Sequence, residues 1–163
     1  SDDSLVVAFA DRAAGEEKDP WRMAVALEQF VHKVVKHKDF TQGFASAAEV
    51  ARSLEGDCTE HAVLLTAMAR AKGIPARVAI GLVYLAPRKL DGSSDPTFFY
   101  HMWTEVFVDG RWVPIDGTLA RGGIGAGHLK IGHSSLQGAS VYSAFLPVLN
   151  VIGKLRIEPI DEP

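Results

Sequence analysis

Apolar positions in the first part of the chain recur at the spacing of a helix. Asp19 followed by Pro20 is a preferred N-cap and first helical residue. Apolar residues then return every three or four positions, at Ala24, Leu27, Val31 and Val34. Because this spacing places them on one side of a helix, it predicts a helix from Pro20 to about His37.

Two capping-box patterns, at 46–49 and 57–60, predict the starts of two further helices. The first pattern opens a short helix that extends to about Leu54. The second opens a longer helix, which Gly73 ends and Pro75 prevents from resuming.

After Gly73 the pattern changes to that of β-strands. Residues 77–85 are rich in Val, Ile and Leu, and residues 100–108 and 111–116 flank the strong hairpin signal Asp109-Gly110. Three other segments are predicted as a loop (89–97), a turn region with five glycines (117–127) and a last strand (155–160). Helices followed by antiparallel strands indicate the α+β class.

Length and composition indicate a soluble globular protein of one domain, residues 1–163. The chain is 47% hydrophobic and 23% charged, as in ordinary globular domains. Its net charge of -3, with no basic run, makes nucleic acid an unexpected partner. The apolar run 5–10 is too short for a membrane span and follows acidic residues, unlike a signal peptide. We expect a soluble domain that is part of a longer protein, either exported or cytoplasmic. The composition does not indicate an oligomeric state.

The single cysteine, Cys58, excludes an intramolecular disulfide. A lone cysteine is more often a small buried hydrophobe than a reactive thiol. With Asp57 as N-cap, however, Cys58 is the first helical residue, where free N–H groups and the helix dipole favour the thiolate. Because the charges of Asp57 and Glu60 oppose the thiolate, a reactive Cys58 needs a histidinium partner.

Of the six histidines, His101 is the strongest candidate for that partner, because it lies on a predicted strand among aromatic residues. His61 lies on the same helix as Cys58 and lacks an evident group to orient it. The other four are predicted on the first helix (His32 and His37) or in or after the glycine-rich region (His128 and His133).

The predicted hairpin brings Asp116 close to His101. With a two-residue turn Val108 faces Arg111 and, further along both strands, Trp103 faces Asp116. Side chains alternate along a strand, so His101 shares a face with Trp103, and Asp116 is its diagonal neighbour at roughly 7 Å between backbones. A turn of another length would move Asp116 to the opposite face. A thiol, a histidine and a carboxylate are the parts of a nucleophilic triad.

Four segments resemble the core of the transglutaminase-like superfamily: 56–62 (GDCTEHA), 69–77 (ARAKGIPAR), 101–106 (HMWTEV) and 112–118 (WVPIDGT). The resemblance covers about residues 46–118. Its motifs look most like those of the bacterial branch, whose members are often assigned as cysteine proteases. It implies a papain-like fold, with N-terminal helices and the Cys-bearing helix packed on an antiparallel sheet that carries His and Asp. The family usually has proline where Gly117 stands, which we expect to alter the loop and not the chemistry.

The resemblance implies a thiol enzyme that transfers acyl groups from an amide bond of a protein or peptide through a thioester. Cys58 is the expected nucleophile, His101 the base and Asp116 the group that orients His101. Hydrolysis is the favoured outcome; an amine acceptor would give a cross-linking transglutaminase, and removal of sugars from asparagine also occurs in the family. A binding domain that keeps only the fold is a further alternative. Expected oxyanion donors are the Cys58 N–H and either Gln42 or Trp21.

A metal site is the main rival interpretation. Cys58, His61 and His101 are zinc-ligand types, but one Cys-x-x-His on a helix without a second pair is a weak signal. We therefore expect neither a bound metal nor a cofactor.

Overall fold

The computed structural model describes residues 2–37, 45–85 and 97–137, together with residues 146, 148, 150, 151, 154, 155 and 157. The helices and strands of these residues are, in chain order, α1 (Ser4–Ala14), α2 (Pro20–Val34), β1 (Lys36–His37), α3 (Ala47–Ser53), β2 (Glu55–Gly56), α4 (Cys58–Ala71), β3 (Ala76–Leu85), β4 (Thr97–Val108), β5 (Arg111–Ile115) and β6 (His128–Ser134).

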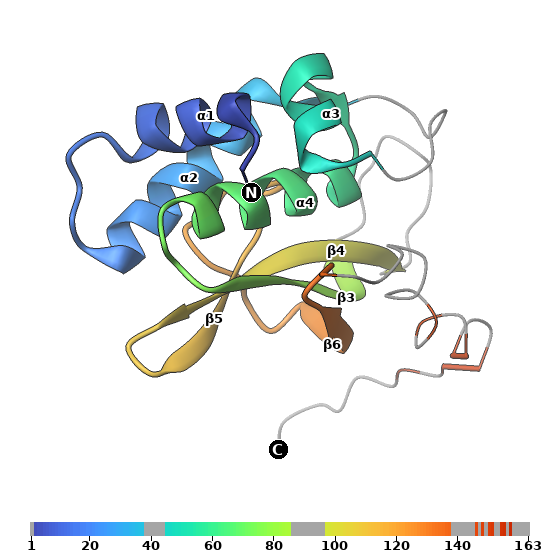
Figure 1. Ribbon diagram of the computed structural model, residues 1–163. Coiled ribbons are helices and arrows are strands. Elements are labelled where there is room, and N and C mark those ends of the chain that lie inside the picture. The colour runs from blue at the N-terminus through green and yellow to red at the C-terminus, as the bar shows by residue number, and fades with distance from the viewer. Residues whose placement is uncertain are drawn as a thin grey trace.

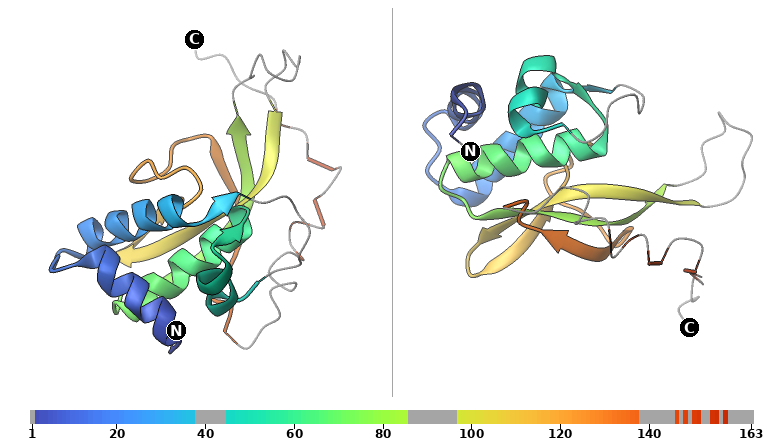
Figure 2. Two further views of the ribbon diagram at one scale, coloured as in Figure 1. Left: turned by 90° about the horizontal axis from the view of Figure 1, so that it is seen from above. Right: turned by 45° about the vertical axis from the view of Figure 1, so that its right-hand side comes forward.

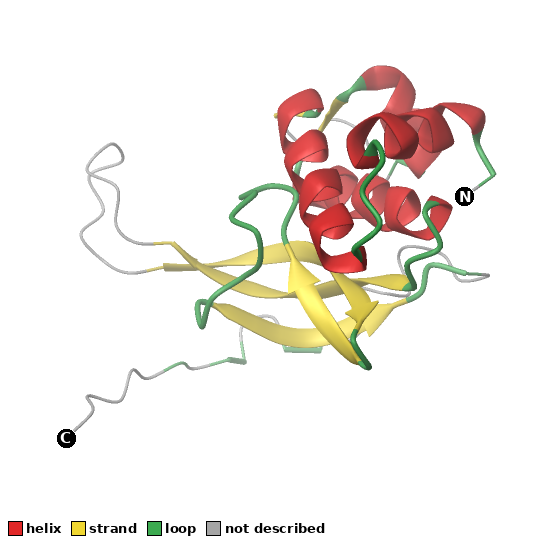
Figure 3. Cartoon of the chain, turned by 90° about the vertical axis from the view of Figure 1, so that its left-hand side faces the viewer, coloured by secondary structure: helices red, strands yellow, loops and turns green. Residues whose placement is uncertain are grey.

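The molecule has a helical layer on one face of an antiparallel sheet (Figures 1 and 3). The sheet has the order β5-β4-β3-β6, and β1 and β2 form a separate short parallel pair. Helix α4 lies against β3 and β4, and the other three helices pack on α4 (Figure 2). This arrangement confirms the α+β class and the papain-like fold expected from the resemblance.

Local sequence signals determine where the helices begin. Asp19 caps α2, and the two predicted capping boxes are present at the starts of α3 and α4. Helix α2 ends at Val34, earlier than predicted, because residues 36–37 pair with residues 55–56 as a parallel ladder. Helix α1 was not predicted; its N-cap is Asp3, whose carboxylate accepts from the N–H groups of the second and third helical residues.

The β4–β5 hairpin has the predicted two-residue turn. Asp109 and Gly110 both have positive φ, 51° and 75°, as this tight turn requires. Val108 pairs with Arg111, and the ladder continues to the pair of Thr104 and Ile115. The predicted register is therefore correct over this ladder, and Asp116 is the first residue after its last pair.

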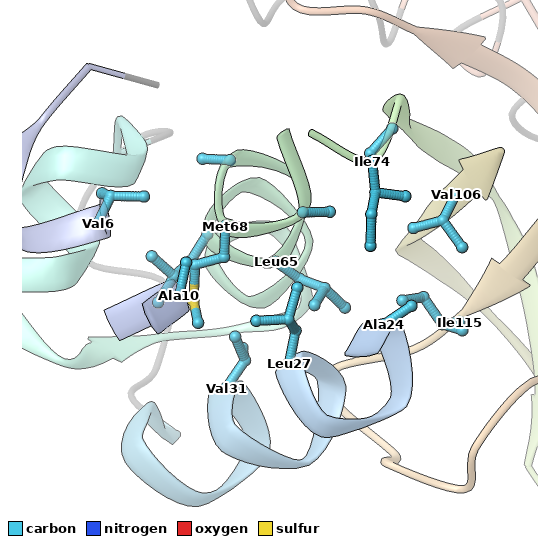
Figure 4. Packing of buried hydrophobic residues seen from close by; sticks show 14 of the residues in the cluster. Val6, Ala10, Ala24, Leu27, Val31, Leu65, Met68, Ile74, Val106 and Ile115 are labelled. Carbon is cyan, nitrogen blue, oxygen red and sulfur yellow. The ribbon is translucent and has the colours of Figure 1, made fainter. Parts of the chain in front are cut away.

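The hydrophobic core surrounds α4. Figure 4 shows Leu65 and Met68 of α4 between α2, which contributes Leu27 and Val31, and the side chains of α1 and the sheet. These four side chains are fully buried. Because α4 contacts both layers, its axis and its first residue are fixed by packing on several sides.

Strand β6 was not predicted, and it pairs with β3 through an irregular register between Ile80 and Gly81. A Cβ at Gly81 would lie 2.0 Å from the carbonyl oxygen of Leu129, so only glycine lets the two backbones approach this closely. The predicted strand at 155–160 lies largely outside the described residues, and Leu155 and Ile157 are not in a strand. The predicted loop at 89–97 also lies outside them, apart from Thr97, which begins β4.

Within the described residues, the helices are all too short or too polar to cross a membrane.

Candidate active site

Cys58 is the first residue of α4, as the capping box predicts. The Asp57 carboxylate accepts the N–H of Thr59 at 2.8 Å, and the Glu60 carboxylate accepts the N–H of Asp57 at 3.0 Å. The backbone at the helix tip is therefore held by its own side chains. Cys58 is partly exposed, so a reagent or substrate can approach it.

The Glu60 side chain folds back over the start of α4, because Gly56 has no side chain and leaves room for it. A Cβ at Gly56 would lie 2.2 Å from the Cβ of Glu60, which no side chain tolerates. Burial raises the pKa of the Glu60 carboxyl, although its hydrogen bond from the Asp57 N–H opposes the rise. Gly56 and Glu60 thus belong to the framework of the helix tip.

His101 and Asp116 form a buried hydrogen bond. His101 lies on β4, Asp116 follows the last residue of β5, and the imidazole Nε2 donates to the carboxylate Oδ2 at 2.7 Å. Both side chains are shielded from solvent, with exposures of 7% and 1%. This hydrogen bond is the contact that the predicted hairpin register allows between the two side chains.

Cys58 is near the same imidazole, because its thiol is one of the groups that raise the pKa of His101. Because Asp116 takes Nε2, Nδ1 is the ring nitrogen left for the sulfur. Burial alone would lower the pKa of His101, but the hydrogen bonds to Asp116 and Cys58 outweigh it and raise the pKa to about 9.

Asp116 remains ionised in this setting. Burial would raise the pKa of its carboxyl, but hydrogen bonds from His101 and His128 outweigh that effect and lower it below the usual range. Its second oxygen, Oδ1, accepts the N–H of Thr118 at 2.8 Å. A buried carboxylate with several donors stays charged and can stabilise an imidazolium.

The structure adds His128, which sequence analysis did not select. Its Nε2 donates to the same Asp116 oxygen as His101, at 3.0 Å. It lies at the start of β6, and its ring meets those of Trp103 and His101 edge-on, with centroids 5.2 and 5.7 Å apart. The one hint in the sequence was Gly81, since glycine inside a strand often marks a close backbone approach.

Glu28 is a second residue that sequence analysis missed. It lies on α2, is fully buried, and accepts the N–H of Asp116 and the N–H of Gly122, both at 2.8 Å. Burial raises the pKa of this carboxyl, while the backbone hydrogen bonds oppose the rise. Its position on the apolar face of the predicted helix, one turn after Ala24, was the available signal.

His61 has a structural contact of its own. It is buried, and its Nδ1 donates to the carbonyl oxygen of Asp57 at 2.5 Å. Burial lowers its pKa, which favours a neutral ring. This contact ties the first turn of α4 together and leaves His101 as the histidine at the thiol.

The two candidates for a second oxyanion donor have different outcomes. Trp21 packs against the main core, and a Cβ at Gly123 would lie 4.0 Å from its ring. Trp21 is therefore a packing residue of the core. Its role as an oxyanion donor stays a prediction. Gln42 lies outside the described residues.

Among the described residues, one group has the donor atoms and spacing to hold a metal ion: His101, Asp116 and His128, with ligand atoms within 4.8 Å of one another. Here both imidazoles donate N–H groups to the carboxylate, at 2.7 and 3.0 Å. These contacts explain why the three side chains lie together: they form a hydrogen-bond network. The group also differs from Cys58, His61 and His101, the possible zinc ligands considered from the sequence.

Known structures share this architecture. The chain aligns with a candidate cysteine protease from Cytophaga hutchinsonii at 24% identity and a TM-score of 0.63, over 80% of this chain and 42% of that one. It aligns with the periplasmic domain of TgpA from Pseudomonas aeruginosa at 22% identity and a TM-score of 0.54, over 72% and 43%. LapG of Legionella pneumophila gives 14% identity and a TM-score of 0.52, over 92% and 82%.

At these identities the likeness concerns the fold. The chain spans less than half of the length of the Cytophaga and Pseudomonas chains that it matches. No curated protein is detectably similar to it. The sequence model of the Transglutaminase-like superfamily matches residues 7–117, from α1 to the residue after Asp116. With more than half of its length matched, and with this fold, the chain belongs to the transglutaminase-like superfamily.

Proposed function

We propose that this protein is a thiol enzyme that hydrolyses amide bonds of proteins or peptides, with Cys58 as nucleophile, His101 as base and Asp116 as the group that orients His101. The observation that carries the proposal is the buried His101–Asp116 hydrogen bond of 2.7 Å, and the Cys58 thiol is among the groups that raise the pKa of the same imidazole. Both support an order of nucleophile, base and orienting carboxylate, as the chemistry requires.

The reaction has two halves. The Cys58 sulfur attacks the amide carbonyl, a C–S bond forms, and the C–N bond breaks as His101 delivers the thiol proton to the leaving amine. Water then attacks the thioester carbonyl while His101 takes a proton from the water. A C–O bond forms, the C–S bond breaks, the carboxylic acid product leaves, and the Cys58 thiolate recovers the proton from His101. Asp116 keeps its negative charge throughout and stabilises the imidazolium.

The helix tip supplies one donor to the oxyanion. In the described part of the chain no group accepts the N–H of Cys58, whereas the next two N–H groups bond to the Asp57 carboxylate. The Cys58 N–H is therefore free for the developing oxyanion, at the positive end of the helix dipole.

The proposal also covers the extent of the domain. We infer that residues 1–163 belong to one transglutaminase-like domain. The family match at 7–117 supports this, as does buried Val148, which packs with Val78, Ile80 and Met102 of the sheet.

A peptide library offered to the wild type and to Cys58→Ala tests the reaction. We expect cleavage products from the wild type alone, detected by mass spectrometry. A primary amine in the same assay distinguishes the acceptors, because a cross-linking enzyme would add the amine to a glutamine side chain. Equal cleavage by Cys58→Ala, or amine addition without hydrolysis, would contradict the proposal.

A further inference from the structure

We propose that His128 is a positioning residue for this site: it holds the Asp116 carboxylate, which in turn holds the base His101. The inference rests on the proposed function, since it assigns His128 a part in the same reaction. His128 acts through Asp116, on the Nε2 side of His101.

The hydrogen bonds of Asp116 show what His128 contributes. Oδ1 accepts the N–H groups of Thr118 at 2.8 Å and Leu119 at 3.4 Å, both from the turn that follows β5. Oδ2 accepts from His101 at 2.7 Å and from His128 at 3.0 Å. Without His128, the partner of Oδ2 in the described residues would be His101 itself, the group that this oxygen has to orient.

The fold holds His128 in a defined position. Its backbone N–H donates to the Gly125 carbonyl at 3.2 Å, and the preceding carbonyl, of Gly127, accepts the N–H of Tyr84 at 2.8 Å. Its side chain is 6% exposed. The close approach of β6 to Gly81 lies one residue further along. Both polar groups of the peptide bond before His128 are therefore held, and a side chain on a fixed backbone can fix its own partner.

Its ring contacts provide an alternative explanation that the test has to separate. The His128 ring meets Trp103 at 87° and His101 at 62°, so it also fills space between them. If packing were its whole contribution, an aromatic ring without an N–H would replace it. If positioning is its contribution, the N–H at the Nε2 position is what matters.

A matched set of variants separates these roles. His128→Gln can place an amide N–H near the original Nε2 position, whereas His128→Phe keeps the ring and removes the donor. We expect kcat of His128→Phe to fall about 10- to 100-fold with KM unchanged, the size of one lost hydrogen bond to a charged group. His128→Gln should retain most of the wild-type kcat.

Two further measurements complete the design. His128→Asn is polar but too short to reach Asp116, so it also removes the donor. It should show the loss of kcat expected of His128→Phe, and it takes the place of that variant if His128→Phe fails to fold. In an Asp116→Asn background, His128→Phe should cause little further loss, because both changes interrupt one path. Retained kcat in His128→Phe, or full additivity with Asp116→Asn, would overturn the inference.

Alkylation of Cys58 by iodoacetamide distinguishes this failure from failure of the proposed function. We expect the wild type to react in its folded state and His128→Phe to react more slowly. A wild type that is alkylated and hydrolyses peptides, with equal rates in His128→Phe, would leave the proposed function intact and overturn the role of His128. An inert wild-type thiol would overturn both.

Discussion

The two halves of the candidate site are built in different ways. The Cys58 half is local: Gly56, Asp57, Glu60 and His61 hold the tip of α4, and all lie within three residues of the cysteine. The other half is long-range, because the Asp116 carboxylate joins β4, the end of β5 and β6. The local half depends on one helix start, whereas the long-range half depends on the register of the whole sheet.

This difference separates what each half contributes. The helix tip presents the sulfur and a free N–H, and it forms wherever α4 forms. In the proposed reaction the Asp116 network sets the charge and orientation of His101, and its hydrogen bonds require three sheet segments to be in place. Apart from Cys58 itself, we therefore expect changes in the long-range half to affect catalysis most, and changes in the residues that hold the helix tip to affect mainly stability.

Among changes outside Cys58, Asp116→Asn should have the largest effect. An amide has one acceptor oxygen where Asp116 accepts from two imidazoles and from the turn, so the tautomer of His101 is no longer enforced. We expect kcat to fall by about 10³- to 10⁴-fold, as in other triads, with the circular dichroism spectrum unchanged. A loss below about tenfold in a folded protein would show that Asp116 is not the orienting group.

The second prediction concerns pH. Because the pKa of His101 is raised from 6.5 to about 9, its protonated form stabilises the fold fully below pH 6.5, and this contribution disappears as the pH rises through about 9. The free energy of unfolding in urea should fall over this range by on the order of 3 kcal/mol. The fall should be much smaller in His101→Gln; an equal fall would assign it to other groups.

Glu28→Gln should reduce stability by about 1–3 kcal/mol, because Gln cannot accept both buried N–H groups that Glu28 accepts. Glu17→Gln is an exposed control: a single Glu17 oxygen, Oε1, accepts two backbone N–H groups on the surface, at 2.8 and 2.9 Å. Urea unfolding should show a clear shift for Glu28→Gln and little for Glu17→Gln. Equal shifts would mean that burial of the Glu28 contacts has no special importance.

The smallest expected effect is in the local half. Glu60→Ala removes the capping-box bond to the Asp57 N–H and should lower stability by about 1 kcal/mol. Glu49→Ala, in the exposed capping box of α3, is the control and should have a smaller effect. Activity should change little in Glu60→Ala. A large loss of activity at unchanged stability would place Glu60 in the reaction itself.

The sequence was sufficient wherever the signal is short-range or set by a turn. The capping box at 57–60 predicted the start of α4 correctly, and the two-residue turn predicted the register that brings Asp116 beside His101. Once the turn at Asp109 is known, every facing pair follows from counting along the two strands. The family resemblance then supplied the expected fold.

The rest depends on contacts between segments far apart in the chain. His128 is 12 residues from Asp116, and Glu28 is 88 residues away; neither lies in a local motif. Strand β6 follows a glycine-rich turn and has little alternation, because most of its residues are partly exposed. Its irregular pairing with β3 at Gly81 cannot be read from a hydrophobic pattern.

The most direct test of the central claim is the rate of iodoacetamide alkylation of folded Cys58 near neutral pH, in the wild type and in His101→Gln. Only a few per cent of an ordinary thiol is ionised at this pH, whereas a thiol paired with an imidazolium is largely thiolate. We expect the wild type to react about tenfold faster than His101→Gln or more. Equal rates, or alkylation only after denaturation, would contradict the account that His101 activates Cys58.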